Sequence, residues 1–340
     1  MHSKVEMEGM YPLLFEQNLF EKVWGGHRIK PLKGMEPDDE PIGESWEVSA
    51  VEGKESIVSN GPLRGKNLRK LTTDYGSDLL GRKVQEMYGD QFPLLIKLID
   101  AEKDLSVQVH PDNDLAMQRH QSLGKTEMWF VMDATEQAFL YSGFKSRINK
   151  DEYKRRVEDG SITDVLQRHE VKRGDVFFLP AGRIHAIGGG TMVAEVQQSS
   201  DVTYRIFDYN RPGLDGKLRE LHPQLAEDAI DYTVYNSYLT NYTERVNKPV
   251  ALTECPYFTV KVHNVTRAFH RKLFKYDSFI VYLCLEGECA VVPVSDKSRA
   301  VVLQRGGTCL VPACDADLYI VPKDKTAKIL EVYIDNKHFN

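Results

Sequence analysis

The sequence predicts a mainly β protein, and two stretches carry most of this prediction. Residues 105–110 alternate apolar and polar side chains, as a strand with two different faces does. Residues 174–185 form a second predicted strand, entered from a Gly-Asp turn and left through a Pro-x-Gly bend. Short strands separated by turns recur over residues 258–334. With 340 residues, the chain can bury a substantial core in two domains or one elaborated domain.

Composition narrows the class of protein. Hydrophobic residues make up 41% and charged residues 28%, and the net charge of −6 is spread along the chain. A nucleic-acid surface needs a clustered basic face, which this distribution does not predict. No apolar run approaches the roughly eighteen residues of a membrane span, and the first residues carry charges where a signal peptide is apolar. We therefore expect a cytoplasmic protein that binds neither nucleic acid nor membrane, as a monomer or homodimer.

Turn residues and periodicity place the other elements. Helical segments are expected over about 62–90, 149–168 and 219–234. Strands are expected over 92–100, within 129–142 and through 192–208. Residues 236–249 are polar and turn-rich, which is typical of a domain boundary. The five cysteines lie after residue 250 without a Cys-x-x-Cys pair, so we expect buried free thiols.

Two residues in the first half have open interpretations. Lys97 interrupts the nearly continuous apolar segment 92–100, and a buried lysine must meet an anion or reach solvent past a strand end. An anionic substrate is one such partner. Trp46 lies in the stretch Gly-Glu-Ser-Trp-Glu-Val and either lines a sugar pocket or packs in the core.

The strand at 105–110 has an unusual polar face. Ser106, Gln108 and His110 fall on that face, where an ordinary half-buried strand carries Lys, Glu or Thr. A hydroxyl, an amide and an imidazole at successive heights are typical of a pocket wall. The residues alone leave the alternative that the histidines are hydrogen-bonded core residues and that Glu127 is a surface acid.

The spacing Gly174, Pro180, Gly182 and His185 resembles the second sequence motif of the cupin superfamily. In cupins this histidine is a metal ligand that points into a small β-barrel. The stretch Gln-x-His at 108–110 and the later Glu127 are similar to the ligands that such a barrel places opposite it.

The same spacing occurs a second time near the end of the chain. Gly306, Pro312, Cys314 and Asp317 repeat it, with aspartate in the histidine position and no preceding Gln-x-His. Unless this is a coincidence, the fold is two cupin-type jelly-roll β-barrels or sandwiches with a few peripheral helices. The expected domains are a catalytic metal-binding domain over 1–245 and a metal-free domain over 246–340.

Further motifs narrow the resemblance to one family. Gly-Lys-Thr-Glu ending at Glu127, Pro-Ala-Gly-x-Ile-His ending at His185, and Ser-Ser-Asp-x-Thr-Tyr-Arg ending at Arg205 resemble type I mannose-6-phosphate isomerases of the shorter bacterial kind. The resemblance implies one zinc ion held by Gln108, His110, Glu127 and His185. It also implies catalysis by Arg205 and a sugar-phosphate pocket that contains Ser106, Lys97, Lys125 and Glu195.

The residue types fit the chemistry that this family implies. Two imidazoles, one carboxylate and one amide oxygen suit a divalent ion of zinc type, although other divalent ions also bind such sets. The expected reaction interconverts mannose 6-phosphate and fructose 6-phosphate by proton transfer through an enediol. Arg205 would stabilise the oxyanion, and either Glu195 or a water held by the ion would transfer the proton.

Two other classes of cupin remain as alternatives. An iron oxygenase usually presents two histidines and one carboxylate, and it does not require an anion pocket with an arginine. A sugar-binding or sensing cupin without turnover would keep the pocket and could dispense with Arg205. The presence of both Arg205 and Lys97 favours the isomerase.

Overall fold

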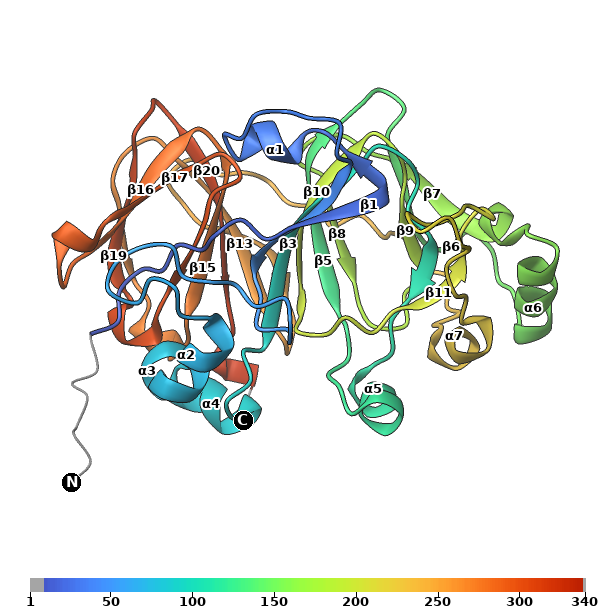
Figure 1. The fold of residues 1–340 in the computed structure, drawn as a ribbon, viewed down its shortest axis with the longest axis horizontal. Coiled ribbons are helices and arrows are strands. Elements are labelled where there is room, and N and C mark those ends of the chain that lie inside the picture. Colours follow the sequence, from blue (N-terminus) through green and yellow to red (C-terminus); the bar gives the residue numbers. More distant parts are fainter. Residues whose placement is uncertain (1–8, 339–340) are drawn as a thin grey trace. The chain divides into compact units, whose positions relative to one another are not determined.

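The computed structural model describes residues 9–338, and it confirms the mainly β fold with a few helices (Figure 1). The chain separates into two compact units. One unit combines Asn18–Glu47 with Leu94–Asn241. The other combines the described residues up to Gln17 with Val48–Pro93 and the chain from Tyr242 onward.

The first unit contains two antiparallel sheets. The larger has the order β1-β2-β3-β10-β5-β8 and the smaller the order β11-β4-β9-β6-β7. We call strands β3 to β10 the first barrel. The strands are β1 (Leu19–Gly26), β2 (Ile42–Val48), β3 (Leu94–Ala101), β4 (Val107–Val109), β5 (Glu127–Ala134), β6 (Phe139–Phe144), β7 (Leu166–Glu170), β8 (Val176–Leu179), β9 (His185–Ile187), β10 (Thr191–Gln198) and β11 (Tyr204–Phe207).

The second unit also contains two antiparallel sheets, with the orders β12-β13-β20-β15-β18 and β14-β19-β16-β17. We call strands β13 to β20 the second barrel. The strands are β12 (Val250–Glu254), β13 (Thr259–Val265), β14 (Phe269–Lys272), β15 (Ile280–Glu286), β16 (Glu288–Pro293), β17 (Val301–Gln304), β18 (Thr308–Val311), β19 (Asp317–Pro322) and β20 (Ala327–Tyr333).

The two barrels share one topology. If ten is added to each strand number, β3-β10-β5-β8 becomes β13-β20-β15-β18, and β4-β9-β6-β7 becomes β14-β19-β16-β17. The repeated spacing in the sequence therefore marks a repeated fold. Asp317 begins β19 where His185 begins β9, as the spacing predicts.

Helices occur in each segment where the sequence predicts them, but they are shorter. The helical pattern up to residue 90 is divided at Gly76 and Gly81, which have positive φ angles of 47° and 90°. Near residue 220 the helix begins only at Pro223, a residue suited to the first turn. The helices are α1 (Ile29–Leu32), α2 (Leu68–Tyr75), α3 (Ser77–Leu80), α4 (Arg82–Tyr88), α5 (Asn113–His120), α6 (Lys150–Glu158) and α7 (Pro223–Ala229).

The units differ from the contiguous stretches 1–245 and 246–340 that the sequence suggested. Helices α2 to α4 belong with the C-terminal strands, because Phe92 packs on Phe279 at a ring-centroid distance of 4.5 Å and the Phe279 amide donates to the Leu80 carbonyl oxygen. The crossing between Asn241 and Tyr242 does fall inside the polar segment 236–249. Contacts of this kind join residues almost 200 positions apart, so local patterns do not reveal them.

Each barrel has its own apolar core. In the second barrel, Cys284, Cys289 and Cys309 are buried among aliphatic and tyrosine side chains, and Cys255 is also buried, as predicted. The prediction was wrong for Cys314, which is exposed. Among residues 9–338 no helix combines the length and the apolar character needed to cross a bilayer.

Candidate active site

One row of side chains crosses the smaller sheet of the first unit. Gln108 on β4 lies opposite His185 on β9 and, at its other side, opposite Arg205 on β11. On β6, Ser142 lies opposite His185. Because directly opposed residues in antiparallel strands point to the same face, four polar side chains share one face of the sheet at one level.

A second row crosses the larger sheet of the same unit. Glu195 on β10 lies between Lys97 on β3 and Trp129 on β5. Glu127 precedes Trp129 by two residues, so its side chain is on the same face of β5. Contacts between Glu127 and the histidines described next show that the polar faces of the two sheets meet.

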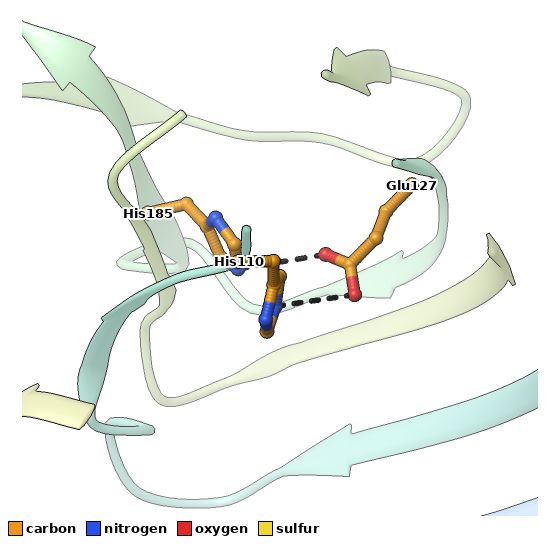
Figure 2. Close-up of side chains that lie close together, drawn as sticks. All are labelled: His110, Glu127 and His185. Atoms are coloured by element: carbon orange, nitrogen blue, oxygen red, sulfur yellow. Dashed lines mark ion pairs between the residues drawn. The ribbon is translucent and has the colours of Figure 1, made fainter. Parts of the chain in front are cut away.

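His110, Glu127 and His185 form the centre of the site. Their nearest ligand atoms all lie within 4.8 Å of one another, and each residue is 1% exposed. His110 Nε2 is 3.4 Å from Glu127 Oε1, and His185 Nε2 is 3.5 Å from Glu127 Oε2. Figure 2 shows both imidazoles turned toward this carboxylate. The two distant stretches named by the sequence thus converge on one point.

Backbone carbonyls fix how both imidazoles present their nitrogens. Nδ1 of His110 lies 2.9 Å from the Val202 oxygen, and Nδ1 of His185 lies 2.8 Å from the Arg183 oxygen. A carbonyl only accepts, so each Nδ1 carries the proton and each Nε2 presents a lone pair to the carboxylate. Burial lowers the pKa of His110 well below its usual value and that of His185 to about 3, so both rings are neutral.

Neutral imidazoles facing a carboxylate create a site that needs a positive charge. His110 Nε2 and Glu127 Oε2 are buried without a hydrogen-bond partner among the described residues, and the ammonium of Lys125 faces only Oε1 of the carboxylate. Burial first, and then the charge of Glu195, raises the pKa of Glu127 to about 7 against the pull of Lys125. A cation between the three donors would remove both the repulsion of lone pairs and the cost of burying the carboxylate.

The distances from Glu127 to the two imidazoles fit a tetrahedral metal ion. Two ligand atoms about 2.0–2.1 Å from a shared zinc ion at the tetrahedral angle lie roughly 3.4 Å apart. The distances from His110 Nε2 and His185 Nε2 to the nearer Glu127 oxygen, 3.4 and 3.5 Å, agree with this value. The Gln108 amide nitrogen lies 3.3 Å from His185 Nε2. Rotation of the Gln108 amide by half a turn would exchange its nitrogen and oxygen, two atoms that coordinates alone do not distinguish, and would bring the oxygen beside His185.

Lys97 is paired within the chain. Its ammonium is 3.5 Å from Glu195 Oε2 and 4.8 Å from the centre of the Trp46 ring. Burial opposes its charge, but Glu44 and Glu195 outweigh burial and raise its pKa. The anion that a buried lysine requires is therefore supplied by glutamates, without a substrate. Trp46 is buried in β2, which confirms the core interpretation, and its ring faces this lysine. A contact between Trp46 and a sugar stays a prediction.

Glu44 completes the lysine's surroundings. Its Oε2 accepts a hydrogen bond from the Trp46 indole at 2.9 Å and lies 3.4 Å from the Lys22 ammonium. Burial opposes its ionisation, but Lys97 and Lys22 lower the pKa of Glu44 to about 2. Glu44 was not among the predicted site residues, although its position two residues before Trp46 on one strand predicts a shared face.

The remaining predicted residues lie around this centre. The Lys125 ammonium is 3.2 Å from Glu127 Oε1. Ser106 is buried two residues before Gln108. Arg205 is brought beside Gln108 by strand pairing, and its Nη1 donates to the Glu220 carbonyl oxygen at 2.9 Å. Burial lowers the pKa of Arg205, and its Nε is buried without a hydrogen-bond partner among residues 9–338.

Comparisons with known proteins place this chain in a family. Residues 13–133 match the model of the type I phosphomannose isomerase catalytic domain, a span that includes Lys97 through Glu127 but ends before His185. The chain is 36% identical over 280 residues to the mannose-6-phosphate isomerase ManA of Bacillus subtilis, which covers 82% of this chain and 86% of that relative. A mannose-6-phosphate isomerase of Streptococcus mutans is 38% identical over 219 residues, or 64% of this chain and 67% of the relative.

A solved structure agrees over nearly the whole length. The crystal structure of the mannose 6-phosphate isomerase from Bacillus subtilis superposes with a TM-score of 0.84 at 30% identity, covering 95% of this chain and 99% of that chain. The relative matches in fold as well as in sequence, and the shared length includes both barrels. The chain therefore belongs to the type I phosphomannose isomerase family, in its bacterial form.

Proposed function

We propose that this chain is a metal-dependent aldose–ketose isomerase that interconverts mannose 6-phosphate and fructose 6-phosphate. Membership of the family supports a sugar-phosphate isomerase. The observation that carries the metal-dependent form is the buried triad of His110, Glu127 and His185, whose donors are spaced for one ion. The proposed reaction moves a proton between neighbouring carbons through an enediol.

We assign the ion as Zn²⁺, held by Gln108, His110, Glu127 and His185. A bound divalent ion would polarise the sugar carbonyl and offset negative charge that develops on its oxygen. The two histidines are prepared for this task because their Nδ1 protons are already held by backbone carbonyls. Rotation of the Gln108 amide would bring its oxygen to the fourth position.

The charges around the triad support binding of a phosphate dianion. Lys97 pairs with Glu195 and Lys125 pairs with Glu127, so the charges of these four residues nearly cancel. Arg205 and a divalent ion then leave the site with about three positive charges, which favour a phosphorylated substrate. Lys97, Lys125 and Ser106 are assigned to the substrate because they are buried beside the ligands and have donor groups.

Arg205 and Glu195 are assigned to proton transfer and charge stabilisation. Arg205 extends the row that contains Gln108 and His185, so its guanidinium can donate to an oxyanion formed beside the triad. Glu195 faces the same space from the opposite sheet, where Lys97 and Trp129 hold its carboxylate. A carboxylate fixed in this way is placed to accept a proton and return it to the adjacent carbon.

A coupled assay that detects fructose 6-phosphate from mannose 6-phosphate tests this function. We expect turnover by the untreated protein, loss of turnover after chelation, and recovery on addition of Zn²⁺. Arg205→Ala should lower kcat about 10²- to 10³-fold, because one donor to the developing charge is removed. The matched control is Arg168→Ala, at an exposed arginine on β7 of the same sheet, which should keep its rate.

Each outcome addresses a separate part of the proposal. Absence of product from the untreated protein would reject the isomerase and would leave a binding protein without turnover. Full turnover after exhaustive chelation would reject the metal dependence. Unchanged turnover by Arg205→Ala would reject the role given to that arginine.

A further inference from the structure

Trp129 links the two polar rows of the first barrel. Its indole Nε1–H donates to Glu195 Oε1 at 2.8 Å, and both residues are buried. The other carboxylate oxygen, Oε2, lies 3.5 Å from the Lys97 ammonium. The two oxygens therefore have different partners on opposite sides, and rotation of the carboxylate would break both contacts.

The same indole also contacts a proposed metal ligand. Its ring meets the His185 ring edge-on, at a centroid distance of 5.2 Å and an interplanar angle of 84°. Trp129 is on β5 and His185 on β9, which belong to different sheets. One rigid bicyclic ring thus fills the space between the carboxylate and the imidazole.

The second barrel shows that this hydrogen bond is a feature of the register. Glu331 on β20 lies opposite Tyr282 on β15, as Glu195 lies opposite Trp129. The Tyr282 hydroxyl donates to Glu331 Oε2 at 2.9 Å. An aromatic donor therefore reaches the glutamate from this position in both barrels, through an O–H in one and an N–H in the other.

We propose that Trp129 is a positioning residue, which holds the Glu195 carboxylate at a fixed place relative to His185 during proton transfer. The inference rests on the proposed isomerase function. Trp129 need not touch the substrate, since it acts through Glu195. Its hydrogen bond to the carboxylate is buried, so its loss leaves Lys97 alone to hold a carboxylate that must be placed within a few tenths of an ångström.

Two substitutions separate the hydrogen bond from the packing. Trp129→Phe keeps an aromatic ring beside His185 but removes the donor, and we expect kcat to fall about 10- to 100-fold, as for other groups that orient a reacting residue. KM for mannose 6-phosphate and the bound metal per chain should stay near their original values. Trp129→Tyr restores a donor of the kind found at Tyr282 and should recover most of the lost rate.

A double variant tests whether Trp129 acts through Glu195. Glu195→Gln alone should lower kcat, and Trp129→Phe added to it should cause little further loss, because the two residues share one interaction. Tyr282→Phe is the matched control: it removes the equivalent bond in the second barrel and should leave kcat unchanged. Independent, multiplicative losses in the double variant, or equal rates for the Phe and Tyr variants, would overturn the inference.

A spectroscopic measurement covers the case in which Trp129→Phe does not fold. The chain has three tryptophans, so the indole N–H resonance of Trp129 can be assigned by elimination with Trp24→Phe and Trp46→Phe. We expect this resonance to move in Glu195→Gln, and an unmoved resonance would overturn the inference. No turnover by the unmodified protein would overturn the proposed function and this inference together. Normal turnover by Trp129→Phe would overturn this inference alone.

Discussion

The first and second barrels each carry a glutamate at the equivalent position, Glu195 on β10 and Glu331 on β20, but the two carboxylates have different partners. In the first barrel Glu195 is held by Trp129 and a lysine and faces the histidine triad. In the second barrel Glu331 accepts a paired set of hydrogen bonds from Arg271, at 2.9 and 2.5 Å, and a further bond from Tyr282. The Glu331 carboxylate is therefore already paired with side chains of the second barrel.

The barrels diverge most at the level of the candidate metal ligands. Glu127 begins β5, whereas the equivalent first residue of β15 is Ile280, which is fully buried in the apolar core. His185 begins β9, whereas Asp317 begins β19 and bonds to His270 at 2.7 Å. The same strand order therefore carries a candidate metal site in the first barrel, and a buried apolar residue and a histidine–aspartate pair in the second.

The largest expected effect tests this ligand row. His185→Ala should abolish turnover and bound metal together, because it removes one of the proposed donors to the ion. Asp317→Ala, at the equivalent position of the second barrel, should keep both. Turnover and metal content per chain are the measurements. Loss of activity in the Asp317 variant would mean that the second barrel takes part in the chemistry.

The next largest effect concerns the second barrel's ion pair. Glu331→Gln leaves the largely buried Arg271 without its partner, so we expect the free energy of unfolding to fall by about 3–5 kcal/mol. Urea unfolding followed by circular dichroism measures this loss. At a temperature where the variant stays folded, kcat should be unchanged. Glu254→Gln, at an exposed pair with Lys337, is the control and should change stability by less than about 0.5 kcal/mol.

A smaller effect is expected where Gly182 in the first barrel corresponds to Cys314 in the second. Gly182 has a φ angle of 88°, and an added Cβ would lie 2.9 Å from the Ala229 carbonyl oxygen. Gly182→Ala should therefore lower stability by about 1–2 kcal/mol. Cys314 does not have a positive φ angle, and Cys314→Ala should be nearly neutral. Thermal unfolding of both variants gives the comparison, and equal losses would contradict it.

The last prediction concerns the free energy of unfolding at low pH. Burial opposes ionisation of Glu331, but His263 and Arg271 outweigh it and hold the pKa of Glu331 far below the unfolded value of about 4.3. A carboxyl with a lowered folded pKa stabilises the fold above the unfolded pKa, and this contribution is lost as the pH falls toward the folded pKa. The loss approaches 1.4 kcal/mol per pH unit, about one power of ten in the unfolding constant.

Unfolding free energies measured between pH 5 and pH 3 test this dependence. The slope should be shallower in Glu331→Gln, since that side chain has no proton to bind. An identical slope in the variant would assign the acid sensitivity to other carboxyls, such as Glu44, whose pKa is also lowered.

The convergence of the candidate ligands was predictable from the sequence because its signals are local. His185 follows a proline bend, and Gln108 and His110 alternate on one short strand. Their partners were harder to predict. The pairing of Trp129 with Glu195, and the closeness of Glu44 to Lys97, depend on which residues of β3, β5 and β10 lie opposite one another. Register between strands so far apart is set by tertiary packing, which a local pattern does not contain.

Local patterns likewise could not predict which segments of the chain make up each unit. Composition and turn residues indicated the crossing near residue 241, where the chain is polar. Nothing in residues 48–93 indicates that their apolar faces pack on strands more than 180 positions later. Helix ends also shifted, because capping residues such as Pro223 decide them and periodicity does not.

The way in which the units are assembled from separate segments has a consequence for biosynthesis. Leu13 and Leu310 exchange backbone hydrogen bonds at 2.8 and 2.9 Å. The first unit is complete once Asn241 has left the ribosome, but the early segments of the second unit must wait for strand β18. During that interval the apolar faces of α2 to α4 lack their final partners, and exposed apolar surface of this kind favours aggregation of partly folded chains.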